Sequence, residues 1–226
     1  MNILAVDTAL GACSAAVLTN GCVVARDHCE MQRGHAEALA PMVESLMHTA
    51  GLGFSVLDRI AVTTGPGTFT GQRVGLAFAR ALGVALKKPV VGVTTLDAMG
   101  EEALAKPPNT TWAVAAADAK RGEIYLGVRS ASSEILLPPE LIRLDAVVAR
   151  ISAFIGSHGR SLAIAGTAAE AVLPLLQRAD LKPVDSRVRQ PDAVFVARVA
   201  IHIAGEAPPK PLYLRAPDAK LPGGFS

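Results

Sequence analysis

Hydrophobic residues recur along the chain in short runs that alternate with helical repeats. The short apolar runs, bounded by polar or glycine-containing turns, predict β-strands over residues 2–6, 13–18, 22–28, 60–63, 90–93, 111–117, 124–129 and 161–165. Repeats at three- and four-residue spacing predict helices over residues 35–49, 72–88, 96–104, 170–178 and 193–204, and residues 145–155 are amphipathic. The dipeptide Asn20-Gly21 is a strong hairpin signal. Strands that alternate with helices indicate an α/β protein.

The stretch Gly65–Gly71 (GPGTFTG) joins a strand to the longest helix. Its glycines and proline demand special backbone geometry, and its threonines can cap a helix whose first free N–H groups could hold an anion. It is not a Walker A loop, because Gln72-Arg73 stands where Gly-Lys is required, and it also fails the dinucleotide fingerprint. A tight turn that only packs the helix on a sheet has about equal weight.

The helix that follows carries a stripe of small residues. Gly75, Ala79 and Gly83 recur at four-residue spacing and therefore lie on one face. Glycine inside a helix costs about 0.5–1 kcal/mol relative to alanine, so the stripe indicates that another backbone comes very close. That backbone could belong to the chain's own sheet or to a helix of another subunit.

Composition narrows the class of protein. The chain has 226 residues, enough for one large domain or two small lobes, and its net charge of +2 argues against a strongly basic grip on nucleic acid. No apolar run is long enough to span a membrane, and no basic region precedes an apolar run at the start. Three cysteines without CxxC spacing favour free thiols in a reducing cytoplasm.

Candidate chemistry is sparse. Asp7 ends the first strand and could sit near metal-bound phosphate, although an Asp that is satisfied by turn amides is the favoured alternative. No two histidines have HxxxH or HExxH spacing, so no helical zinc pair is expected. The charged stretch 118–123 is either an active-site turn or a solvated hairpin tip. The stretch 106–109 is the candidate lobe boundary, dividing the chain into residues 1–105 and 106–226, and the proline-rich tail should lie extended against a surface.

Four stretches carry a resemblance to a known family: ILAVDTALGACSAAV, GPGTFTGQRVGLAFARALG, DAKRGEIY and PLYLRAP. The chain resembles the TsaB (YeaZ) family, the dimerisation subunit of the bacterial machinery that makes threonylcarbamoyladenosine in tRNA. The resemblance implies an actin-like and Hsp70-like (ASKHA) two-lobe fold with a reduced second lobe. The family's catalytic relative, TsaD, binds a metal through a His-x-x-x-His helix, and the corresponding residues 94–99 here read TTLDAM. No metal site and no catalytic residue are therefore expected in this chain.

The implied function is a non-catalytic scaffold. It would pair with TsaD, support recruitment of the ATPase TsaE, and serve threonylcarbamoyl transfer to the adenosine next to the anticodon, with tRNA bound through the complex and a homodimer formed when alone. The expected dimer interface comprises Leu39, Val43, Leu46, Arg73, Gly75, Phe78, Ala79, Leu82 and Gly83. Asp7, Thr8, Gly65 and Gly67 are the residues expected nearest a nucleotide; no cofactor is expected on the chain alone, and ATP or ADP could lie at the subunit junction. The alternative is an independent actin-like ATPase.

Overall fold

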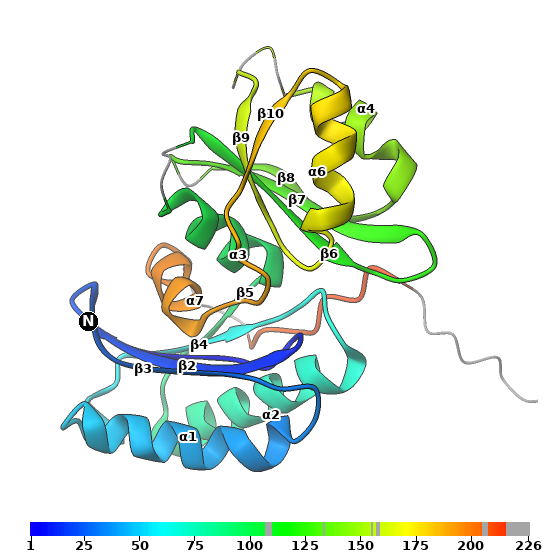
Figure 1. Ribbon diagram of the computed structural model, residues 1–226. Coiled ribbons are helices and arrows are strands. Elements are labelled where there is room, and N and C mark those ends of the chain that lie inside the picture. The colour runs from blue at the N-terminus through cyan, green and yellow to red at the C-terminus, as the bar shows by residue number, and fades with distance from the viewer. Residues whose placement is uncertain (107–109, 133, 155, 157–158, 205–207, 216–226) are drawn as a thin grey trace, which may run out of the picture.

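The computed structural model describes residues 1–106, 110–132, 134–154, 156, 159–204 and 208–215 (Figure 1). They form two five-stranded sheets, with strand orders β3-β2-β1-β4-β5 and β10-β9-β6-β7-β8. The predicted lobe boundary at 106–109 falls almost wholly outside the described residues, and so do Pro217 and Pro222 of the proline-rich tail.

The first sheet combines an antiparallel meander with two parallel strands. Its strands are β1 (Asn2–Asp7), β2 (Ala12–Thr19), β3 (Cys22–Glu30), β4 (Arg59–Thr63) and β5 (Val90–Val93). Asn20 and Gly21 both have positive φ angles, 52° and 81°, as a two-residue hairpin of this twist requires. Helices α1 (His35–Thr49) and α2 (Phe69–Leu86) cover one face, and the short helix η1 (Phe54–Val56) leads into β4.

The second sheet is formed by later strands. They are β6 (Trp112–Asp118), β7 (Glu123–Ser130), β8 (Ile135–Arg143), β9 (Ser161–Ala165) and β10 (Lys182–Asp185). Its outer face is covered by α4 (Val147–Ser152), which follows η2 (Leu144–Ala146), and by α6 (Ala169–Arg178). Strands β8 and β10, which the hydrophobic pattern did not predict, are the two edges of this sheet.

Two helices lie between the sheets and join the lobes. Helix α7 (Ala193–Ala200) packs on the first sheet through a core that includes Ile3, Ala5 and Val196. Helix α3 (Thr95–Leu104) packs on the alanine-rich face of the second sheet through Leu96 and Met99. The two helices also contact each other, so the layers run α1/α2, first sheet, α7/α3, second sheet, α6/α4 (Figure 1). Because α7 follows the second sheet in sequence, the chain returns to the first lobe near its end.

The small-residue stripe of α2 faces the chain's own first lobe. A Cβ atom on Gly75 would lie 2.8 Å from the Thr8 hydroxyl, and one on Gly83 would lie 2.3 Å from a methyl group of Val90. Ala79 has no exposed surface. The stripe therefore does mark a close approach, but the approach is made by side chains of the first lobe of the same molecule, such as Thr8 and Val90.

Candidate functional site

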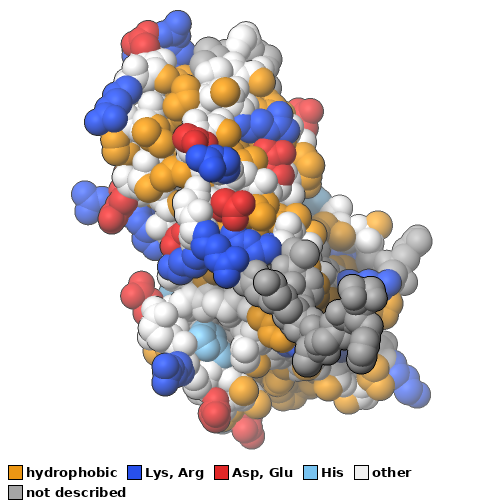
Figure 2. All heavy atoms as spheres, turned by 90° about the vertical axis from the view of Figure 1, so that its right-hand side faces the viewer, with side chains coloured by type: hydrophobic (Ala, Val, Ile, Leu, Met, Phe, Trp, Pro, Cys, Tyr) orange, Lys and Arg blue, Asp and Glu red, His pale blue; other side chains and the backbone are white. Residues whose placement is uncertain are grey.

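A cavity of about 800 Å³ opens between the two lobes. The first lobe contributes the β1–β2 turn at Gly11 and the starts of α1 and α2, at His35 and Thr68; the second lobe contributes Asp118 and Lys120 from the β6–β7 turn. Figure 2 shows Lys and Arg side chains gathered at the waist of this side of the molecule, where the two lobes meet. We call this cavity the interlobe cleft.

The glycine-rich turn forms part of the first-lobe wall by interlocking with the β1–β2 turn. The amide of Thr68 donates to the Ala9 carbonyl at 2.8 Å, and the Thr8 hydroxyl donates to the Gly71 carbonyl at 2.7 Å. A Cβ atom on Gly67 would lie 2.3 Å from the Ala9 oxygen, and one on Gly71 would lie 2.1 Å from the Thr8 oxygen. Glycine is required here because two backbones touch, and Thr68 caps α2 by accepting from the Gly71 amide.

The carboxyl group of Asp7 is buried behind this wall. Its Oδ1 accepts from the Thr63 hydroxyl at 2.5 Å and from the Ala9 amide at 3.1 Å, whereas its buried Oδ2 has no hydrogen-bond partner. Burial raises the pKa of Asp7 to about 7; the two hydrogen bonds oppose this shift, and the charge of Asp192 adds to it. The carboxyl group therefore changes its protonation state near neutral pH and has one oxygen free to bind a proton or a cation.

The four residues predicted nearest a nucleotide lie together but behind the cleft. Asp7, Thr8 and Gly65 are buried, Gly67 is partly buried, and none of the four lines the cavity. Within the part of the chain that the structure describes, no three His, Cys, Asp or Glu side chains are grouped so that they could hold a metal ion. Proximity of these residues to a nucleotide stays a prediction.

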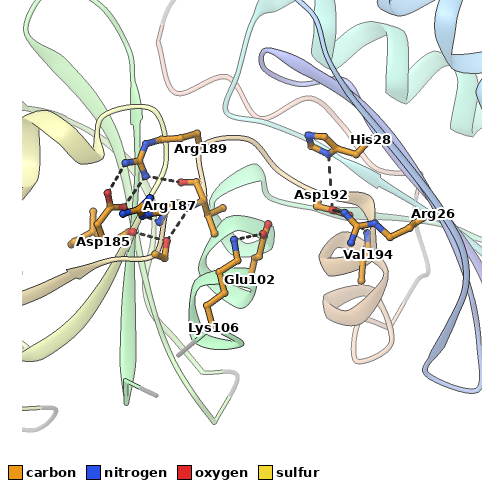
Figure 3. Close-up of polar contacts among 12 residues, drawn as sticks. Arg26, His28, Glu102, Lys106, Asp185, Arg187, Arg189, Asp192 and Val194 are labelled. Atoms are coloured by element: carbon orange, nitrogen blue, oxygen red, sulfur yellow. Dashed lines mark hydrogen bonds and ion pairs between the residues drawn. The ribbon is translucent and has the colours of Figure 1, made fainter. Parts of the chain in front are cut away.

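The segment that joins β10 to α7 closes one side of the cleft. Asp185 accepts from the guanidinium of Arg189 at 2.7 Å, which lowers the pKa of that carboxyl, and Asp192 accepts from Arg26 of β3 at 3.0 Å (Figure 3). Asp192 also caps α7 through the Val194 amide. Fixed at both ends, the segment presents Gln190, whose side-chain oxygen accepts from the Gly11 amide at 2.9 Å. The turn amide that could face a phosphate is thus already bonded within the chain.

The charged turn at 118–123 lies beside the interlobe cleft, and its role as an active-site turn stays a prediction. Asp118 and Lys120 line the cleft, yet the Lys120 side chain is 80% exposed and pairs with Asp118 at 2.6 Å. That hydrogen bond lowers the pKa of Asp118. The pair leaves little net charge for a ligand at this point of the cleft.

A second surface lies on the outside of the first lobe. Helices α1 and α2 enclose an open groove of about 520 Å³, lined by Ala36, Leu39, Phe69, Thr70, Arg73, Val74, Ala77 and Phe78. Phe69 is 56% exposed at one end of α2, and Val84 is 80% exposed toward the other end. We call this surface the α1–α2 groove; it is apolar apart from Thr70 and Arg73.

The predicted interface residues divide into two sets against this groove. Arg73 is exposed, and Phe78 and Leu82 are partly exposed, so these three can contact another molecule. Leu39 lines the groove, although only 1% of its surface is exposed. The remaining residues are buried in the first lobe, so their placement on a subunit surface was wrong: Val43, Leu46, Gly75, Ala79 and Gly83. These residues are buried because the small-residue stripe of α2 and the apolar side chains of α1 both face the first sheet.

Sequence reasoning missed Phe69, Ala77 and Tyr213 at this surface. Phe69 stands inside the glycine-rich stretch, where an aromatic residue has no role in backbone geometry. Its presence there was the signal that could have indicated an exposed contact residue. Ala77 lies on the exposed side of α2, away from the small-residue stripe that the sequence analysis singled out. Tyr213 could not be connected to α2 from its position in the tail.

The topology and the relatives place the chain in a class and then in a family. A solved ROK hexokinase from Thermus thermophilus is 15% identical and superposes with a TM-score of 0.52 over 88% of this chain and 98% of its own, so the fold is the actin-like ASKHA fold. The family model "TsaD: tRNA N6-adenosine threonylcarbamoyltransferase" matches residues 29–186. A Pseudomonas aeruginosa structure described as similar to peptidase YEAZ is 28% identical, with a TM-score of 0.80 over 95% of this chain and 99% of its own.

The Escherichia coli protein named tRNA threonylcarbamoyladenosine biosynthesis protein TsaB is 40% identical over 126 residues, which cover 55% of this chain and 53% of that protein. The chain belongs to the TsaB/YeaZ family. The expected family and fold class are thereby confirmed. The match to this relative spans about half of its length.

Proposed function

We propose that this chain is a non-catalytic scaffold subunit of threonylcarbamoyladenosine biosynthesis, which pairs with a TsaD-type subunit through the α1–α2 groove. The observation that carries the proposal is an exposed apolar groove on a member of the TsaB/YeaZ family. The relative from E. coli is named for this biosynthesis. The paired subunits would support a TsaE-type ATPase and bind tRNA together, and the same groove would form a homodimer when the partner is absent.

The geometry of the groove fits a helical partner. Its rim exposes Phe69 and Ala77 on α2 and Ala36 on α1, and small alanine side chains let a second pair of helices approach closely. The family-model match includes both helices, so a TsaD-type subunit should carry a corresponding pair. Two like helix pairs can pack face to face about a pseudo-twofold axis, which buries both apolar surfaces.

The proposal is tested by placing a charge in the groove without touching the core. Ala77 is exposed on α2, so Ala77→Arg should leave the chain folded while weakening binding to the TsaD-type subunit of the same organism at least tenfold. Ala171→Arg, at an exposed position of α6, is the matched control and should bind as the wild type does. Affinity is measured by titration calorimetry, and threonylcarbamoyladenosine formation is measured with and without the chain.

Wild-type affinity in the Ala77→Arg variant would place the partner surface elsewhere. Failure of the wild-type chain to bind the TsaD-type subunit, or to support modification of tRNA, would reject the scaffold function itself.

An independent nucleotide-dependent activity is the second candidate, favoured by one observation. The free Oδ2 of buried Asp7 could take part in binding a cation behind the cleft. Against it stands the bond between the Gly11 amide and Gln190, which occupies a turn amide that a phosphate would need. Titration of the purified chain with ATP and magnesium separates the candidates, because binding with turnover in the absence of a partner would favour the enzyme. A nucleotide at the subunit junction would instead bind only to the complex.

A further inference from the structure

The end of the described chain forms a strap across the first lobe. We call residues Pro208–Arg215 the C-terminal strap. Arg80 of α2 donates from Nε to the Pro209 carbonyl at 3.0 Å, and the Leu212 amide donates to the Thr64 carbonyl at 2.8 Å. Pro209 also lies so close to Gly92 of β5 that a Cβ atom there would be 2.7 Å away. These contacts fix the strap beside α2 and the edge strand of the first sheet.

Farther along, the strap becomes part of the surface that borders the α1–α2 groove. The Tyr213 hydroxyl accepts from Arg73 Nε at 3.0 Å, and its ring stacks on Phe69 with 5.9 Å between centroids and 26° between planes. The Arg73 guanidinium lies 3.5 Å from the centroid of the Phe69 ring. Tyr213 is 45% exposed, so this stack adds a large aromatic face to a groove that Phe69 and Arg73 also line.

Two residues later the strap reaches the other lobe. Arg215 donates to the Ala119 carbonyl at 2.7 Å and forms an ion pair with Glu123, with 23% of its own side chain exposed. Both partners belong to the β6–β7 turn, which also supplies Asp118 and Lys120 to the interlobe cleft. The strap therefore touches the groove on one side and the mouth of the cleft on the other.

We infer that the C-terminal strap couples the partner surface to the interlobe cleft: a subunit seated on the Phe69–Arg73–Tyr213 stack holds Tyr213 in place, and Arg215 thereby steadies the β6–β7 turn. The identity of the seated subunit as TsaD-type rests on the proposed function. The coupling is short-range, because Tyr213 and Arg215 are separated by a single residue of extended chain. It makes Tyr213 a contact residue of the docking surface and Arg215 a positioning residue for the turn.

Hydrogen exchange on the full chain tests the link without any partner. The amides of Ala119 and Glu123 are bonded within the turn, to Glu123 and Lys120, so their exchange reports its opening. Tyr213→Ala should speed their exchange about tenfold, the order expected from losing the stack on Phe69 and the hydrogen bond from Arg73. Arg215→Ala should do the same. Val84→Ala, at a position of α2 that is 80% exposed and takes part in none of the strap contacts named above, is the control and should leave the turn unchanged.

A second exchange experiment adds the TsaD-type subunit to the chain. Its addition should slow exchange of the turn in the wild type and should not do so in the Tyr213→Ala or Arg215→Ala variants. Turn exchange within twofold of wild type in Tyr213→Ala would overturn the inference. If the wild-type chain forms no complex, the scaffold proposal fails, and the comparison of free chains still decides whether the strap links the two sites.

Discussion

Replacing Asp7 with Asn should remove a pH dependence of stability that the buried carboxyl imposes. Asp7 has no exposed surface, and its pKa rises from 3.8 to about 7 in the folded chain, chiefly through burial. A carboxyl whose pKa is raised on folding binds its proton more tightly in the native state. Its favourable contribution is therefore fully present below pH 3.8, is lost as the pH rises to about 7, and is constant above that value.

The size of the effect follows from the shift. Between pH 5 and pH 7 the unfolded carboxyl is ionised while the native one goes from protonated to about half protonated. The free energy of unfolding therefore falls by at most about 1.4 kcal/mol per pH unit and by about 2 kcal/mol over the interval. Asn in place of Asp7 keeps an acceptor for the Thr63 hydroxyl and the Ala9 amide but cannot ionise. Its new N–H groups would occupy the position of Oδ2, which has no partner, so some stability at pH 5 is lost.

Urea unfolding at pH 5, 6, 7 and 8 measures the difference between wild type and Asp7→Asn. The free energy of unfolding of the variant, minus that of the wild type, should rise by about 2 kcal/mol from pH 5 to pH 7 and change little from pH 7 to pH 8. Asp27→Asn, on the exposed strand β3, is the matched control and should follow the wild-type curve. Parallel curves for Asp7→Asn and the wild type would refute the assignment of a raised pKa.

Two further substitutions test the packing of the lobes by chemical denaturation. Ala79→Leu should lower the free energy of unfolding by about 1–3 kcal/mol, because it overfills a site with no exposed surface, whereas Ala77→Leu on the outside of the same helix should change it little. Arg129→Ala should cost about 1–3 kcal/mol, since the 5% exposed guanidinium pairs with Glu101 at 2.9 Å beside Asp97 and its loss leaves two partly exposed carboxylates without their cation. If the Ala79→Leu chain instead has normal stability and fails to bind its partner, the small-residue stripe contacts another subunit after all. For Arg129→Ala, recovery by a second substitution, Glu101→Gln, separates lost pairing from lost packing.

Most of the fold could be predicted from the sequence because local signals agreed with tertiary packing. The first-sheet strands and the helix over residues 35–49 follow from apolar periodicity, and Asn20-Gly21 forms the predicted hairpin. The missed strands share one property. Strand β8 contains Pro138 and Pro139, and β10 contains Pro183, residues that argue against a strand in the interior of a sheet. Both strands are sheet edges, where proline is tolerated. The local sequence does not show which strands will lie at an edge.

The candidate site was less predictable. A stripe of small residues predicts a close neighbour, but it does not show whether that neighbour belongs to the same chain or to another subunit. Gly75 and Gly83 mark contacts with Thr8 and Val90 in the same lobe, so the stripe supports α2 on its sheet. The side of α2 that stays exposed carries Phe69, Arg73 and Ala77, and no spacing in the sequence sets these three apart.

The strap shows why the two functional surfaces could not be connected from sequence. Arg73 and Tyr213 are 140 positions apart, and Arg215 meets Glu123 across 92 positions. These side chains lie in three of the stretches that carry the family resemblance, but nothing in the local sequence shows which of them meet. Their meeting depends on α7 returning the chain to the first lobe, after which the tail must pass α2 before it reaches the second lobe. The strap is therefore a segment that touches both lobes, bonded to Arg73 beside the α1–α2 groove and to Ala119 in the β6–β7 turn. Under the proposed scaffold function, that path would connect the partner surface to the interlobe cleft.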